Sequence, residues 1–248
     1  MTVLCLRIVS EPRLWFVFIL FAMLSVGMLY TDGHAQTVVI SEDVSAGRGV
    51  PEFGVNRKHF RHFYTGIHFV AGQPEASGAD VLNWRSWRFE MGHRYKRKFS
   101  ETFSGGYELF FRRDMYTPRQ EAGKVIPDTL INDREKLVLL TVGGGLYQRI
   151  NFGQRGNHMG RYIDIGGYAD LMFHARHVRF NSDDGLRIRE RITGLGYLSS
   201  IGYGPSLRAG VGNVVVKLSY RASDLFTPSA NLPEWPRFTA GIEFGMHP

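Results

Sequence analysis

Apolar and polar residues alternate along most of the chain from residue 57 onward. In the clearest segment, Ile163, Ile165 and Leu171 are separated by polar residues that include Asp164 and Asp170. Alternation with a period of two is typical of a β-strand whose two faces meet different surroundings. The pattern predicts eight strands, at about 58–71, 83–98, 99–113, 136–150, 161–180, 189–203, 206–223 and 237–246.

The links between these segments differ in length in a regular way. Those after the second and sixth segments, near Lys98 and at 203–206, are short, whereas those after the first, third, fifth and seventh are longer, with 114–135 the longest. Short turns on one side and long loops on the other are typical of bacterial outer-membrane barrels. The link 151–160 is an exception, because a short turn is expected there. We therefore expect an all-β fold, an eight-stranded antiparallel up-and-down transmembrane β-barrel at 57–248.

The N-terminus has the parts of an export signal. Arg7 and Arg13 precede the apolar run 14–29, and the small residues Gly33 and Ala35 follow it. A charged start, an apolar middle and a small-x-small end are typical of a secretory signal peptide. A permanent transmembrane helix is the alternative, but the run is short for a span of about 20 residues. We expect a cleaved signal peptide at 1–35 and a flexible periplasmic lead-in at 36–56.

Composition narrows the class of protein further. No long apolar run follows Leu29, which excludes a helical membrane protein. The single cysteine, Cys5, would leave with the signal peptide, so the mature chain would have no disulfide and no thiolate metal site. The formal net charge of +7 could indicate nucleic-acid binding, but the basic residues are spread along the chain. We expect contact with anionic lipid head groups or an acidic surface partner instead, and no nucleic acid.

The C-terminal segment resembles the closing strand of a bacterial outer-membrane barrel, the signal that the barrel-assembly machinery reads during insertion. The positions that carry this resemblance are a polar residue, a glycine and two bulky apolar residues: Thr239, Gly241, Phe244 and Met246. Together with 220–226 and Leu232-Pro233, this strand resembles the end of the PorT-like outer-membrane β-barrel family of gram-negative bacteria, over about 193–246. The resemblance implies an exported outer-membrane barrel and, less directly, an accessory role in protein secretion. His247-Pro248 departs from it, because many members end on an aromatic residue.

The polar faces of the predicted strands would place charged side chains inside the barrel. An interior of eight strands is just wide enough for side chains to fill it, and charges removed from water must be paired. We therefore predict a plug of ion pairs and hydrogen bonds, with Lys217–Glu243 as one pair; the alternative is a narrow polar path or a small-ligand site. The predicted network contains Arg88, Glu90, Arg94, Glu108, Arg112, Asp164, Asp170, Lys217, Arg221 and Glu243.

Catalytic, cofactor and metal sites are not predicted. Ser182, Asp183 and Asp184 could meet His174 or His177, but 181–185 is typical of a turn, and no G-x-S-x-G element is present. His174-x-x-His177 and the similar pair at 59 and 62 would point to opposite faces of a strand. The glycines at 143–145 lack the lysine and hydroxyl residue of a phosphate loop.

The function expected from these features is non-enzymatic. We expect a structural or interaction protein of the outer membrane whose extracellular loops, above all 114–135, meet a protein partner. Accessory work in protein secretion, a lipid-modifying enzyme and a soluble lipocalin-type barrel are the alternatives. Aromatic residues near the strand ends fit interfacial girdles; they are Trp84, Trp87, Tyr95, Tyr107, Tyr203 and Trp235.

Overall fold

The computed structural model describes residues 52–153, 156, 158–183 and 186–247. The predicted signal peptide at 1–35 lies outside these residues, as does most of the predicted lead-in. The helices of the described part are two single 3-10 turns, η1 (Asn83–Arg85) and η2 (Pro228–Ala230), and no helix there is long and apolar enough to cross a membrane. The strands are β1 (His59–Ala71), β2 (Trp87–Lys98), β3 (Phe103–Tyr116), β4 (Arg134–Phe152), β5 (Arg161–Asp183), β6 (Leu186–Thr193), β7 (Ile201–Val211), β8 (Val214–Tyr220) and β9 (Phe238–Met246).

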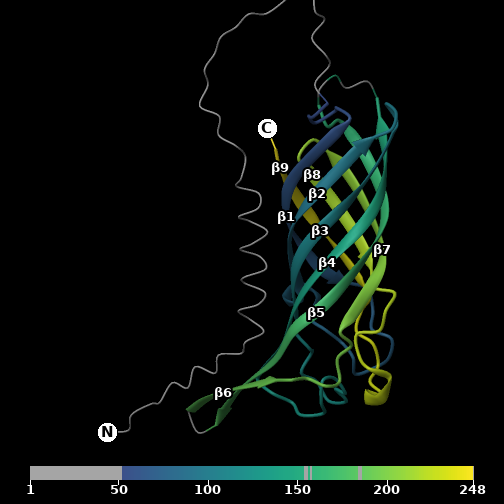
Figure 1. Cartoon of the computed structure of the whole chain (residues 1–248). Coiled ribbons are helices and arrows are strands. Elements are labelled where there is room, and N and C mark those ends of the chain that lie inside the picture. The colour runs from purple at the N-terminus through teal and green to yellow at the C-terminus, as the bar shows by residue number, and fades with distance from the viewer. Residues whose placement is uncertain (1–51, 154–155, 157, 184–185, 248) are drawn as a thin grey trace, which may run out of the picture. The chain divides into compact units, whose positions relative to one another are not determined.

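Eight of these strands form one antiparallel sheet that closes on itself (Figure 1). β1 pairs with β2 on one side and with β9 on the other, and β4 pairs with β5 to complete the ring. β6 is not part of the ring, because it pairs with the last part of β5, from Arg176 to Asp183. We call β6 and this part of β5 the arm. The all-β, antiparallel and closed character of the predicted fold is confirmed.

The strands of the ring are staggered. Following paired residues from Ile67 around the ring leads to His174 in one direction and to Ile163 in the other, both on β5. Because the two paths meet the same strand at different residues, the strands run at an angle to the barrel axis.

The two faces of the ring have opposite polarity. On β1, Phe63 and Ile67 are about half exposed, whereas Tyr64 and His68 are buried. The outward-facing apolar residues form a surface that we call the outer wall. It includes Phe63, Ile67, Met91, Leu109, Val142, Leu146, Ile165, Leu171, Ile201, Leu207, Val216, Leu218, Ile242 and Phe244.

The predicted bounds of the sixth and seventh strands are wrong, although Val214, Val216 and Leu218 lie on a strand and face outward as predicted. The segment 189–203 falls mostly on β6 and the loop after it, so Leu195 and Tyr197 are loop residues and not outward-facing strand residues. The predicted turn at 203–206 lies inside β7, and the actual turn is at 212–213. Gly204-Pro205 has the composition of a turn. A proline is tolerated in β7 because β8 pairs with this strand only from Ser206 onward, which makes Pro205 an edge position.

A β-bulge corrects the prediction for the end of β5. Leu140 pairs with His174, but the next residue, Thr141, pairs with Met172, so Phe173 is the extra residue. Beyond a bulge the faces of a strand exchange. His174 therefore lies on the outer face with its partner Leu140, and not on the polar inner face that the alternation predicts.

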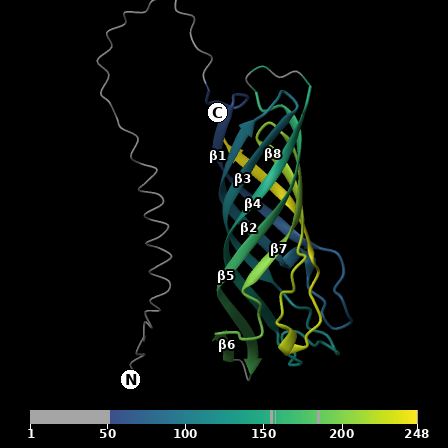
Figure 2. The same ribbon diagram turned by 45° about the vertical axis from the view of Figure 1, so that its right-hand side comes forward.

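The links divide the barrel into two ends (Figure 2). The links 99–102 and 212–213 and the described residues of the link after β4 lie at one end, together with the start of β1 and the end of β9; we call it the turn end. The longer loops 72–86, 117–133 and 221–237 lie at the other end with the arm, and we call it the loop end.

Candidate functional site

The polar faces of the strands bring charges together in the middle of the barrel. Glu90 accepts hydrogen bonds from Arg112 (2.6 Å), Lys217 (2.6 Å) and the hydroxyl of Tyr64 (2.8 Å). Lys217 also lies 3.0 Å from Glu243, which is the pair predicted from the sequence. Each of these side chains is at most 1% exposed. The group is therefore removed from water on every side.

Glu108 continues this network toward the turn end. Arg94 lies 2.9 Å from both Glu108 and Glu243, and Arg208 forms a further hydrogen bond with Glu108. Arg94 stands directly opposite Glu108 in the β2–β3 ladder. Opposite charges at such cross-strand positions stabilise a sheet, so the strand register itself places the pair.

Further pairs extend the network toward both ends. At the turn end, Arg149 makes two hydrogen bonds to Asp164, at 2.6 and 2.9 Å, and its guanidinium lies 3.5 Å from the ring centroid of Tyr162. Toward the loop end, Arg88 bonds to Asp114 at 2.5 Å. Two parallel bonds from one guanidinium to one carboxylate form the strongest common type of ion pair.

The charges joined by ion pairs inside the barrel balance; Lys96 is also buried there and donates a hydrogen bond to the carbonyl oxygen of Val55. The ion pairs join six cations to six carboxylates, which are Arg88, Arg94, Arg112, Arg149, Arg208 and Lys217 with Glu90, Glu108, Asp114, Asp164, Asp170 and Glu243. Asp114, Arg149 and Arg208 are missing from the predicted set. Each lies two positions along its strand from an inward-facing residue, so the period of two predicts that it also faces inward.

Arg221 is the predicted interior residue that the structure places elsewhere. Its guanidinium bonds to Glu234 at 2.7 Å, in the loop 221–237. Glu234 also accepts the backbone N–H groups of Leu225 (2.9 Å) and Phe226 (3.0 Å). Because Arg221 follows the last residue of β8, it fixes the fold of this loop and not the middle of the barrel.

The loops pack into an apolar cluster that we call the cap. Trp235 is fully buried, with its ring centroid 4.8 Å from that of Tyr116 and 5.4 Å from that of Phe226. Trp235 is thus a core residue and does not belong to an interfacial girdle. The cap draws on loops 72–86, 117–133, 194–200 and 221–237 and contains Val70, Ala79, Val81, Tyr116, Ile126, Leu137, Leu139, Leu198, Leu225, Phe226 and Trp235.

A small cavity lies between the cap and the ion pairs. Its volume is about 30 Å³, and its lining includes Arg88, Asp170 and Arg221. Such a space holds about one water molecule. The cavity therefore fits a bridging water and not a larger ligand.

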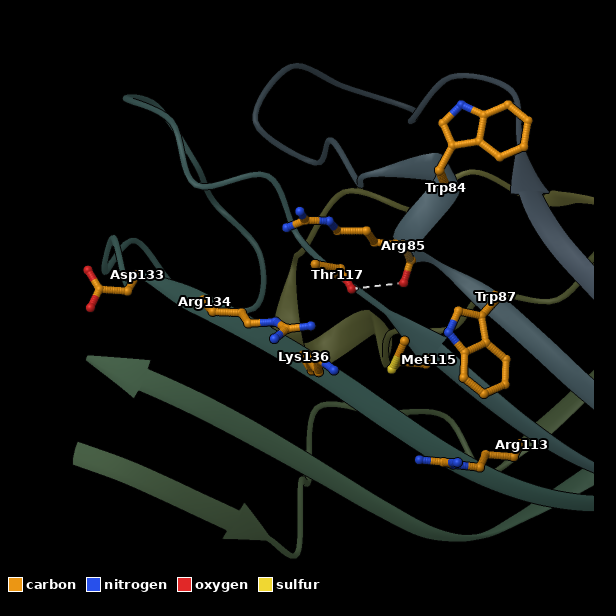
Figure 3. A pocket seen from close by; sticks show the side chains of 9 residues that line it. All are labelled: Trp84, Arg85, Trp87, Arg113, Met115, Thr117, Asp133, Arg134 and Lys136. Atoms are coloured by element: carbon orange, nitrogen blue, oxygen red, sulfur yellow. Dashed lines mark hydrogen bonds between the residues drawn. The ribbon is translucent and has the colours of Figure 1, made fainter. Parts of the chain in front are cut away.

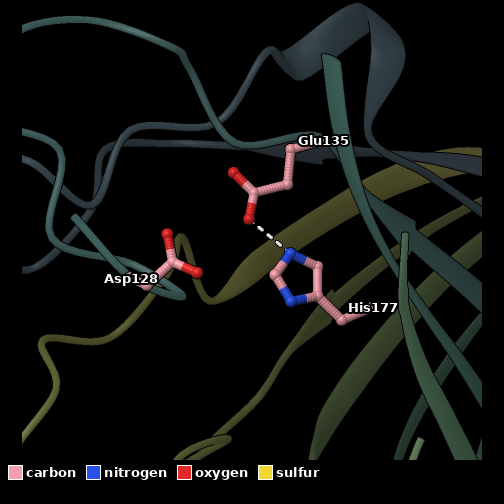
Figure 4. A group of neighbouring side chains, drawn as sticks. All are labelled: Asp128, Glu135 and His177. Carbon is pink, nitrogen blue, oxygen red and sulfur yellow. Dashed lines mark hydrogen bonds and ion pairs between the residues drawn. The ribbon is translucent and has the colours of Figure 1, made fainter. Parts of the chain in front are cut away.

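One group near the loop end has the composition of a metal site (Figure 4). Asp128, Glu135 and His177 offer ligand atoms within 4.8 Å of one another. Glu135, however, bonds to His177 and to the ammonium of Lys124, and Asp128 bonds to Arg179. Lys124 also lies 3.6 Å from Asp128. Since these cations already neutralise both carboxylates, the group acts as an ion-pair lock between loop 117–133 and β5.

Tyr197 lies beside this lock. Burial, together with the negative charges of Glu135 and Asp128, raises the pKa of Tyr197 to about 12. Its ring stacks with Phe226 at a centroid distance of 6.2 Å, and its hydroxyl has no hydrogen-bond partner in the described part of the chain. The phenol is therefore held in its neutral form.

The outer face has a hollow of about 560 Å³ at the loop end (Figure 3). Its polar lining is mostly basic, and two tryptophans also line it. Asp133 also lines the hollow, but its carboxylate accepts the backbone N–H of Ser182 at 2.7 Å. The lining residues are Trp84, Arg85, Trp87, Arg113, Met115, Thr117, Asp133, Arg134 and Lys136.

The four residues of the predicted insertion signal lie on two different faces of β9. Phe244 and Met246 point outward and are more than half exposed. Thr239 is buried and hydrogen-bonds to Ser219 at 2.6 Å. A Cβ at Gly241 would lie 2.2 Å from the carbonyl oxygen of Ile67, so close packing across the β1–β9 seam requires glycine at this position.

The side chains considered for catalysis are not brought together. Ser182 lies eight residues beyond His174, roughly 26 Å along an extended strand. His177 points to the opposite face, into the lock described above. The side chain of Asp183 and all of Asp184 lie outside the described residues.

The other histidine pair also divides between the two faces. His59 lies 2.6 Å from the hydroxyl of Tyr95, whereas the side chain of His62 is buried in the barrel. These two rings cannot bind one ion, as the strand period predicts.

Comparisons with known proteins assign no family. No protein-family model matches the chain. No curated protein matches it either. The resemblance of 193–246 to the PorT-like barrels stays a prediction.

Proposed function

We propose that the chain is a small outer-membrane β-barrel with a sealed interior, and that its role is non-enzymatic, as a structural or interaction protein acting through its loop end. The observation that carries this proposal is the inverted polarity of the ring. Charged side chains such as Glu90 and Arg112 are fully buried, while Ile242 and Val216 of the outer wall are about half exposed. Water favours the opposite arrangement, and a bilayer favours this one.

The two ends of the barrel support an orientation in the membrane as well as a membrane location. In bacterial barrels the short turns face the periplasm and the long loops face outward. The loop end carries the cap, the lock and the arm, whereas the turn end has the two-residue link 212–213. We therefore assign the loop end to the extracellular side.

A pair of isoleucine variants tests the membrane assignment. Ile242 is the middle residue of β9 on the outer wall, and Ile131 is an exposed residue of loop 117–133. In phosphatidylcholine vesicles, Ile242→Arg should lower the free energy of unfolding by about 2–4 kcal/mol, because arginine would lie in hydrocarbon. Ile131→Arg should change it by less than about 0.5 kcal/mol. Equal effects in urea titrations would mean that both residues meet water and would end the proposal.

The sealed interior has its own test. Balanced ion pairs fill the barrel and the cap covers its loop end, so purified protein in a planar bilayer should pass no steady current. Sustained open-channel conductance would show that ions cross the interior, and the chain would then be a pore.

A further inference from the structure

Seven cations gather on the outer face at the loop end, and we call them the basic patch. Arg113 lies near the end of β3, Arg134 and Lys136 open β4, and the others come from η1 and the arm. The full set is Arg85, Arg113, Arg134, Lys136, Arg176, Arg189 and Arg191. Four of its members line the hollow of Figure 3.

The strand register places these residues side by side on one face. Lys136 pairs with Val178, which pairs with Arg191, so the two cations lie two strands apart. That separation is about 10 Å. Arg134 and Arg189 are related in the same way through Phe180. The patch therefore spans β3, β4, β5 and β6 as one surface.

The charges of the patch repel one another. Lys136 is repelled by the positive charges of four neighbours, Arg85, Arg113, Arg134 and Arg189. Arg176 is repelled by those of three neighbouring arginines. Within the described ranges, none of the seven forms an ion pair with a carboxylate. Such a concentration of one sign of charge attracts anions.

Protection of an exposed edge explains only part of the patch. Arginines on β6 keep a free strand edge from pairing with another chain, which accounts for Arg189 and Arg191. Arg113, Lys136 and Arg176 lie instead on strands that are paired on both sides. These three need a different reason.

The surroundings of the patch indicate the kind of anion. Toward the turn end, the same face continues into the outer wall at Val142 and Leu171. Trp84 is 85% exposed beside the hollow, and Arg113 lies 5.5 Å from the ring centroid of Trp87. Tryptophans and cations where an apolar surface ends are typical of the head-group level of a membrane. An acidic protein or a nucleic acid would not need the adjoining apolar wall.

We infer that the basic patch binds the phosphate groups of an anionic membrane lipid whose hydrocarbon chains lie against the adjoining outer wall. This inference rests on the proposed membrane location. Guanidinium groups present paired N–H donors that match phosphate oxygens. A lipid with more than one phosphate fits a patch of this width better than a lipid with a single charge.

The test compares two lipids on the full chain folded in phosphatidylcholine vesicles. Diphosphoryl lipid A should bind about tenfold or more tightly than its dephosphorylated form, as charge-assisted bonds to phosphate are lost. Equal binding of the two lipids by a correctly inserted barrel would overturn the inference and leave the proposed function intact. Failure to insert would instead remove the proposed function, and the inference with it. The comparison of lipids needs no variant, so it remains decisive if a variant does not fold.

Matched triple variants locate the site. Arg113→Gln, Lys136→Gln and Arg176→Gln together should abolish the preference for the phosphorylated lipid. The control carries Arg61→Gln, Arg97→Gln and Arg161→Gln, three exposed arginines of the turn end, and should keep the preference. Equal losses in both variants would mean that net charge alone attracts the lipid. Displacement of lipid A by polyglutamate at equal charge concentration would identify an acidic protein as the ligand. Either result contradicts the inference.

Discussion

The interior cations and the basic patch contain the same residue types in two opposite settings. Inside the barrel, six cations form ion pairs with six carboxylates, and none of these cations is more than 6% exposed. On the outer face, seven cations gather, and none of them forms an ion pair with a carboxylate of the described residues. Burial forces pairing because an isolated charge in a low-dielectric interior is very costly. Exposure removes that demand, so the surface cations stay unpaired, and their concentration on one face attracts anions.

Removing one interior carboxylate should have the largest effect. Glu90→Ala leaves Arg112 without its 2.6 Å partner and takes one carboxylate from Lys217, which should lower the free energy of unfolding by about 3–5 kcal/mol. The control is Glu121→Ala, since Glu121 pairs with Arg119 on the surface and its loss should cost about 1 kcal/mol or less. Urea titration in vesicles measures both. Similar losses for the two variants would show that the interior pairs are not special.

Replacing both members of an interior pair should cost less than the separate replacements suggest. Arg149→Met or Asp164→Leu alone leaves a buried charge, at about 3 kcal/mol or more, whereas the double variant leaves an apolar contact. The coupling energy from this double-mutant cycle should exceed about 1 kcal/mol. Additive effects would mean that the two charges do not depend on each other.

Changes in the basic patch should affect the free energy of unfolding in the opposite direction. The triple variant Arg113→Gln, Lys136→Gln and Arg176→Gln removes repulsion between like charges, so in a zwitterionic detergent its free energy of unfolding should be unchanged or up to about 1 kcal/mol higher. A loss of the size expected for Glu90→Ala would place these cations in a structural network, and the contrast between the two settings would disappear.

Tyr197, a partly buried titratable group, is a third setting. Its replacement should have the smallest effect on stability. Because its pKa is raised to about 12 from the usual 10.0, its contribution to stability is complete below pH 10 and is lost as the pH rises toward 12. Tyr197→Phe removes this loss without removing a hydrogen bond. Limited proteolysis of the loops between pH 9 and pH 12.5 should show the cap of the variant opening at higher pH than that of the unaltered chain. Identical pH profiles for the two proteins would contradict a raised pKa at Tyr197.

Much of the barrel can be predicted from the sequence, because the face on which a strand residue lies depends on its position along its own strand. The faces of Ile67 and His68, or of Glu243 and Phe244, are set by a period of two and need no knowledge of the neighbours. The same rule finds most of the interior charges. It fails at His174, because the bulge near Phe173 depends on how β4 and β5 pair.

The loop end could not be predicted in the same way. The alternation of arginine and isoleucine in β6 is typical of a barrel strand, yet this strand lies outside the ring. Trp235 and Ile126 stand in loop segments distant in the sequence. Their meeting in the cap depends on how four loops converge, which no local pattern records. The basic patch was missed for the same reason, since its members come from four strands and a short helix.

β5 links the barrel to its arm in a way that has a mechanical consequence. It is one strand of 23 residues, which reaches about 75 Å when extended. Its first part is held in the ring by β4 and β7, and its last part carries β6 beyond the loop end. A pull on the arm therefore runs along this strand and loads its hydrogen bonds to both ring neighbours together, in shear. The eight residues of β6 are themselves held by their own ladder to Arg176–Asp183 of β5.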